Sequence, residues 1–69
     1  MNKANVITVQ VDVYYRFMMA FISDLPRYNI EYVGKGSGEP ADALYDRIEI
    51  RGAEEDIIDL KIDWMKYMN

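Results

Sequence analysis

Acidic side chains recur at a helical spacing near the end of this sequence of 69 residues. Glu55, Asp59 and Asp63 are four residues apart, so a helix over this segment places their carboxylates on one face. Asp56 lies beside them. Carboxylates bind Mg²⁺ or Ca²⁺ where they converge on one point, but a row along a helix spreads them along its axis. The row therefore favours contact with a basic surface of a partner, and an ordinary solvated helix face is the alternative.

Groups suited to nucleophilic or metal-assisted catalysis are few. The sequence contains no Cys and no His. It therefore lacks a thiol nucleophile, a zinc finger of the usual kind and the usual general base near neutral pH. Besides the tyrosines, hydroxyl groups occur only at Thr8, Ser23 and Ser37, and none has an activating base in view. We expect no enzymatic activity, no metal and no cofactor.

The glycine-rich segment of residues 34–40 also carries a lysine and a serine. It lacks the G-x-x-x-x-G-K-[ST] order and precedes an expected strand instead of opening a helix, so it does not predict a phosphate site. It is typical of a hairpin loop, which can still contact a partner or border a small-ligand crevice. This loop and the strand after it form a second candidate surface, made of Lys35, Ser37, Glu39, Tyr45, Arg47 and Arg51.

Length and charge narrow the class of protein. A chain of 69 residues, 51% of them hydrophobic, predicts one domain over residues 1–69 with its own core. The net charge of −4 argues against direct nucleic-acid binding, which needs a positive field. The longest apolar stretch, residues 13–22, is interrupted by Arg16 and is shorter than the about 20 residues of a membrane span. We expect a cytoplasmic protein without membrane contact.

Alternation of apolar and polar residues predicts three strands. They cover residues 6–11, 28–33 and 44–51. In the third, Ile48 and Ile50 face the core. The outward side chains of the first and third strands are Thr8, Gln10, Arg47, Glu49 and Arg51.

Helical periodicity predicts two helices. The first covers residues 13–24, with Asp12 as its N-cap and Pro26 as its stop. The second begins after Gly52, runs close to the C-terminus and carries Trp64 at the centre of its buried face. Its second apolar stripe, which either packs on the first helix or forms an interface, consists of Ile58, Ile62 and Met65.

The order β-α-β-β-α predicts an α+β fold. A right-handed crossover lets the third strand lie between the first two, with both helices on one sheet face. This is a truncated ferredoxin-like arrangement that lacks the last strand. The missing strand leaves the edge of the first strand unpaired, so pairing with another chain is expected there. A homodimeric structural or regulatory subunit is therefore an alternative function.

Residues 53–63 resemble the C-terminal helix of small phage-encoded uracil-DNA glycosylase inhibitors. The resemblance implies a small acidic protein, such as a DNA mimic, that blocks a nucleic-acid enzyme. It assigns no role to an individual residue.

Our leading hypothesis is a non-enzymatic protein-binding module. It is an inhibitor or adaptor of the kind that phages and mobile elements direct against host proteins, for example nucleic-acid-acting or defence proteins. The expected partner-binding residues are Glu55, Asp56, Asp59, Ile62 and Asp63. A small-ligand sensor that uses the loop of residues 34–40 is a further alternative.

Overall fold

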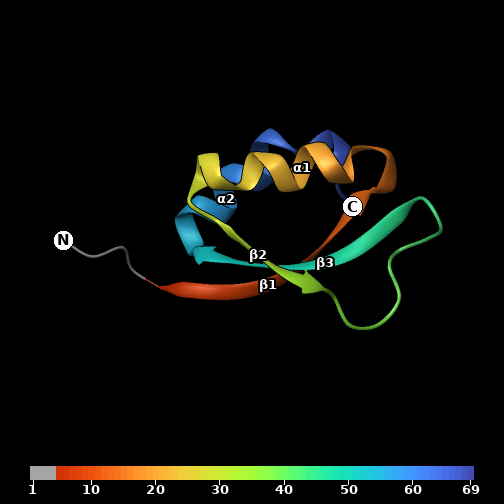
Figure 1. Ribbon diagram of the computed structural model, residues 1–69, viewed down its shortest axis with the longest axis horizontal. Helices are drawn as coiled ribbons and strands as arrows, with labels where there is room; N and C mark the ends of the chain where they lie inside the picture. Colours follow the sequence, from red (N-terminus) through yellow and green to blue (C-terminus); the bar gives the residue numbers. More distant parts are fainter. Residues whose placement is uncertain (1–4) are drawn as a thin grey trace.

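A three-stranded sheet covered on one face by helices forms the computed structural model, which describes residues 5–69 (Figure 1). The strands are β1 (Val6–Tyr14), β2 (Glu31–Lys35) and β3 (Tyr45–Ala53). The order in the sheet is β1-β3-β2, and β3 is antiparallel to both neighbours. An α+β fold built on three strands and two helices is therefore confirmed.

Two α-helices and three short 3₁₀ turns form the second layer. The helices are α1 (Met18–Asp24) and α2 (Glu54–Asp63). The turns η1 (Tyr15–Phe17) and η2 (Leu25–Tyr28) flank α1, and η3 (Met65–Tyr67) follows α2. In the part of the chain that the structure describes, neither α-helix has the length or apolar character needed to cross a membrane.

The strand β1 is longer than the sequence predicts, and α1 begins later. Asp12 is not a helix N-cap, because the alternation of Val11, Asp12 and Val13 continues the strand. The two valines face the helices and are buried, whereas Asp12 points to the other face. The residue is only 7% exposed there, because Arg47 and the loop after β2 bond to its carboxylate.

The segment before β2 also differs from the prediction. Tyr28 belongs to η2, and Asn29 follows in the left-handed conformation, with φ of 64°. Asparagine tolerates this conformation better than most residues, so it ends the turn and redirects the chain. As a result β2 begins at Glu31 and includes Lys35, which was predicted to lie in the loop.

The core lies between the sheet and the helix layer. Ile48 and Ile50 are buried in it, as predicted. Trp64 is half-buried and packs against this core; its ring meets Phe21 edge-on, with 5.2 Å between ring centroids. The complete core cluster consists of Val11, Val13, Phe21, Leu25, Ile30, Ile48, Ile50, Ile57 and Leu60.

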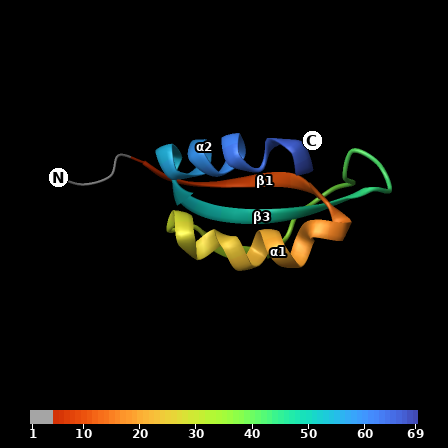
Figure 2. The ribbon, with the colours of Figure 1, turned by 90° about the horizontal axis from the view of Figure 1, so that it is seen from above.

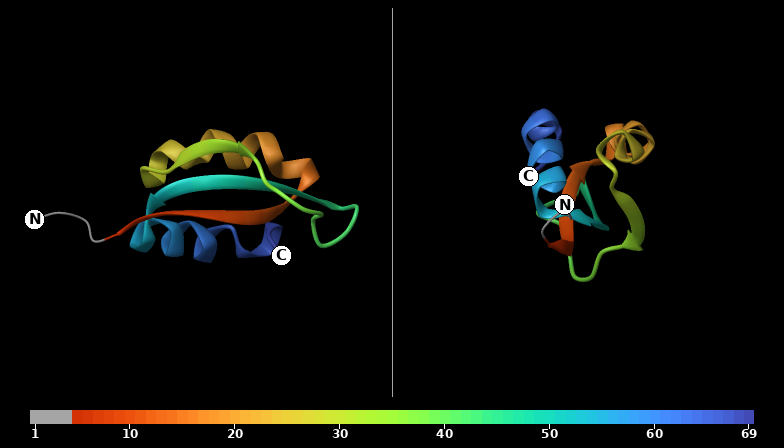
Figure 3. Two further views of the ribbon diagram at one scale, coloured as in Figure 1. Left: turned by 90° about the horizontal axis from the view of Figure 1, so that it is seen from below. Right: turned by 90° about the vertical axis from the view of Figure 1, so that its left-hand side faces the viewer.

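The two helices sit over different edges of the sheet. From above and from below, α2 lies beyond β1, on the side away from β3 (Figure 2; Figure 3, left). The end-on view shows α1 above the opposite side of the sheet (Figure 3, right). The helix α2 therefore overhangs the β1 edge.

Candidate functional site

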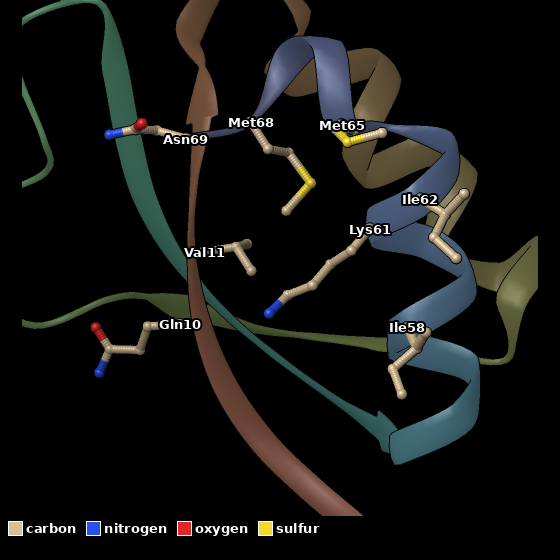
Figure 4. Close-up of a pocket in the computed structure, with 8 residues that line it drawn as sticks. All are labelled: Gln10, Val11, Ile58, Lys61, Ile62, Met65, Met68 and Asn69. Atoms are coloured by element: carbon tan, nitrogen blue, oxygen red, sulfur yellow. The ribbon is translucent and has the colours of Figure 1, made fainter.

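A groove of about 380 Å³ runs between β1 and α2 (Figure 4). We call it the edge groove. β1 forms one wall, α2 and η3 form the other, and the last two residues of the chain close one end. Its lining residues are Gln10, Val11, Ile58, Lys61, Ile62, Met65, Met68 and Asn69.

Three large apolar side chains line the helical wall of the edge groove. Ile58, Ile62 and Met65 are 50%, 60% and 66% exposed. They follow one another on successive turns, so they form one stripe that faces away from the core (Figure 4). This stripe does not pack against α1, which excludes the first of the two alternatives predicted for it. Its use as an interface remains a prediction.

The free backbone groups of β1 point away from β3, to the open edge of the sheet. Two hydrogen bonds extend the β1–β3 register: Glu54 N donates to Asn5 O, and Tyr15 N donates to Leu44 O. The odd-numbered residues of β1 therefore bond to β3. Because backbone direction alternates along an antiparallel strand, the amide and carbonyl groups of Thr8 and Gln10 point to the open edge.

Residues 68 and 69 cover the open edge of β1 near the C-terminal end of that strand. Asn69 N donates to Asp12 O at 3.0 Å, and Met68 forms an antiparallel bridge with Val13. The edge of β1 is thus covered beside Val13 and open beside Thr8 and Gln10. The sequence predicts a wholly unpaired edge and misses this contact, because two residues are too few for a recognisable strand pattern.

Lys61 reaches from α2 into the edge groove, toward β1 (Figure 4). It forms no ion pair with any residue from 5 to 69. Lys61 is exposed, so its ammonium group is accessible to a carboxylate of a partner and forms with it an ion pair of the modest strength typical of a protein surface. Lys61 is not among the site residues predicted from the sequence.

The predicted acidic row lies on the exposed side of α2, but its members differ. Asp63 accepts a hydrogen bond from the hydroxyl group of Tyr28 in η2, and this bond raises the pKa of Tyr28. Glu55 and Asp56 also have interaction partners. Of the four carboxylates, only Asp59 forms no hydrogen bond or ion pair within the described residues. Ile62, the apolar member of the predicted site, lies in the edge groove beside this row.

The second predicted surface does not form one free patch. Arg47 donates to Asp12, and Ser37 exchanges hydrogen bonds with Gln10. The ring of Tyr45 lies 6.3 Å from that of Tyr14. The contact of Ser37 with Gln10 holds the loop against β1, and the other two contacts join β1 to β3. The remaining members, Lys35, Glu39 and Arg51, are exposed on separate segments.

No family model, curated protein or solved structure gives a significant match to this chain. The proposed function is therefore based on the geometry of the edge groove.

Proposed function

We propose that this chain is a small, non-enzymatic protein-binding module, an inhibitor or adaptor that holds its partner through the edge groove and the adjoining face of α2. The observation that carries the proposal is the exposed stripe of Ile58, Ile62 and Met65. Isolated exposed apolar residues are ordinary on a protein surface, but a contiguous set that lines a groove is typical of a binding site.

The charge of the surface supports a particular class of partner. The chain carries 12 acidic and 8 basic residues, and Asp59, on the helix that bears the apolar stripe, has no hydrogen-bond or ion-pair partner within residues 5–69. Such a surface attracts basic partners and speeds their association. A nucleic-acid-acting or defence protein of a host cell is the partner class we favour. In this proposal the chain is an inhibitor of the kind that phages and mobile elements encode, and it acts in the cytoplasm.

The order of the strands in the sheet supports a ferredoxin-like description of the fold. With β3 between β1 and β2 and with both helices on one face, the chain corresponds to a ferredoxin-like arrangement whose fourth strand position is mostly open. In this description, the edge groove is the place that the fourth strand would fill.

Affinity capture with matched variants tests the proposal. Ile62→Ser and Met65→Ser shorten two exposed side chains of the groove, and Leu44→Ser shortens one outside it that is 51% exposed. We expect a protein captured from a cell extract by the wild-type chain and by Leu44→Ser to be lost from both groove variants. The purified pair should then show the same ranking in a binding titration. Equal capture by all four proteins would refute the proposal.

A further inference from the structure

We infer that the edge groove takes an extended strand of a partner protein, which pairs with β1 and places alternate side chains beneath α2. This inference rests on the proposed function and specifies the occupant. The strand is apolar at the positions that face α2, apart from one Asp or Glu that meets Lys61.

The backbone of β1 provides the first argument. Thr8 and Gln10 direct their amide and carbonyl groups to the open edge of β1, which borders the groove at Gln10, and the β1–β3 register leaves these groups without a partner in β3. An open strand edge is a template for another strand, because the added chain satisfies these groups. The open part, residues 6–11, has a length of about 20 Å and contains no charged residue or proline that would prevent pairing.

The end of the chain shows that a strand fits this position. Met68 and Asn69 already run antiparallel to β1 beside Val13, with the amide of Asn69 bonded to Asp12. A partner strand continues the same row past Gln10 and Thr8. One end of the β1 edge is therefore already paired with extended backbone, so the edge has a geometry with which a strand can pair.

The helical wall sets the side-chain pattern of the occupant. In a strand, successive side chains point to opposite faces of the sheet. Every second side chain of the added strand therefore faces Ile58, Ile62 and Met65, and these positions need to be apolar. Lys61 projects into the same space without a carboxylate partner in residues 5–69, so one acidic side chain on that face supplies the missing charge.

A second copy of this chain fits the groove less well than a single strand. Because α2 lies beyond β1, a two-fold axis that paired β1 with its own copy would bring both α2 helices over the same strands (Figures 2 and 3). Packed helices need about 8–10 Å between their axes. Adjacent strands are only about 4.8 Å apart. The occupant is therefore a strand that carries no helix above it.

Amide hydrogen exchange in the full chain tests the pairing. The probe is a terminally blocked nonapeptide in which valine and threonine alternate and the central valine is replaced by glutamate. When nine-tenths of the chain is bound, exchange at Thr8 and Gln10 should slow by about tenfold. The amides of Ile7 and Val9 already bond to β3, so they should change little and serve as a control in the same strand.

Charge exchange tests the contact with Lys61. Replacing the glutamate of the peptide with lysine should weaken binding by about threefold or more. Lys61→Glu should reverse this preference, so that the lysine peptide binds better. An unchanged preference would show that Lys61 does not face the occupant and would overturn this part of the inference.

Proline substitution tests the role of the open edge directly. Thr8→Pro removes an amide hydrogen that points to the open edge of β1 and leaves the bonds to β3 in place, which an edge strand tolerates. We expect it to weaken peptide binding more than tenfold, whereas Thr8→Ala should bind as the wild-type chain does. Circular dichroism and thermal unfolding confirm that both variants are folded.

Three other outcomes would overturn the inference in distinguishable ways. If the peptide shifts the signals of Ile62 and Met65 without slowing exchange at Thr8 and Gln10, strand pairing is wrong and the proposed function survives. If these amides are protected without peptide, increasingly so at higher protein concentration, the occupant is a second copy. If no peptide of the series binds at millimolar concentration, the strand mode is wrong, and the capture experiment alone decides the proposed function.

Discussion

Asp12 and Arg47 face each other across β1 and β3, with 2.7 Å between Asp12 Oδ1 and Arg47 Nε. The second carboxylate oxygen accepts the backbone amide of Ala41 in the loop. These bonds, with that of Arg47 foremost, hold the pKa of Asp12 below its ordinary value even though burial acts in the other direction. A single carboxylate thus connects the two strands to the loop on the sheet face away from the helices.

Removing one partner of this pair should destabilise the protein more than removing both. Arg47→Ala leaves the buried carboxylate of Asp12 without its cation, so the free energy of unfolding should fall sharply. The double variant Asp12→Ala/Arg47→Ala buries no unpaired charge and should recover part of the loss. Urea denaturation of the two single variants and the double variant measures the difference. Additive effects would contradict the coupling.

Asp24 should make stability depend on pH in the acidic range. Its carboxylate accepts hydrogen bonds from Arg27 and from Trp64 Nε1, which lower its pKa from 3.8 to about 2. A carboxyl group whose pKa is lower in the folded than in the unfolded state stabilises the fold at pH values above the unfolded-state pKa. This stabilisation is lost as the pH falls through the folded-state pKa. Asp24→Asn should therefore be less stable than the wild-type chain at neutral pH. The difference should shrink between pH 3.8 and about pH 2. Thermal unfolding at a series of pH values measures this, and a constant difference would contradict it.

Two acidic residues of α2, Asp59 and Asp63, should differ in how much they contribute to the stability of the fold. Asp59→Lys breaks no hydrogen bond or ion pair within residues 5–69, so its free energy of unfolding should stay within about 0.5 kcal/mol of the wild-type value. Asp63→Lys breaks the hydrogen bond from Tyr28 and should cost about 1 kcal/mol. Association with a partner should slow in Asp59→Lys if the acidic row steers binding. Equal stability of the two variants would contradict this distinction.

Gly36 should tolerate no side chain. A Cβ atom at this position would lie 2.5 Å from Arg47 Cγ and 2.9 Å from Gln10 Oε1. Gly36→Ala therefore forces the loop away from β1 and β3, and we expect a loss of about 1–3 kcal/mol in chemical denaturation. Glu39→Ala is the control, since Glu39 is exposed in the same loop. An alanine variant as stable as the control would show that the loop moves freely.

Sequence periodicity predicted the parts of the fold that follow from local pattern. The inward direction of Ile48 and Ile50 follows from a strict alternation over one strand, and the stripe of Ile58, Ile62 and Met65 follows from helical spacing. Asp12 was misassigned because a carboxylate before an apolar run is also typical of a helix N-cap. Its true partner, Arg47, lies 35 residues away, and no local pattern reveals it.

The edge groove could be predicted only in part. Ile62 was singled out as a contact residue, but the opposite wall comes from Gln10 and Val11, and Met68 and Asn69 close one end. Which segments face each other depends on how far α2 overhangs β1, and that position is decided by packing of the core. The sequence also gives no sign that Asp63 is bonded to Tyr28, since η2 and α2 meet only in the folded chain.

Trp64 has a spectroscopic consequence, because it is the only tryptophan of the chain. Its indole ring is half-buried, hydrogen-bonded to Asp24 and edge-on to Phe21, whereas the lining of the edge groove does not include it. Its intrinsic fluorescence will therefore change when α2 separates from α1 and stay nearly constant when the groove is occupied. Emission from one native residue can thus distinguish an unfolded variant from a folded one that has lost only its binding.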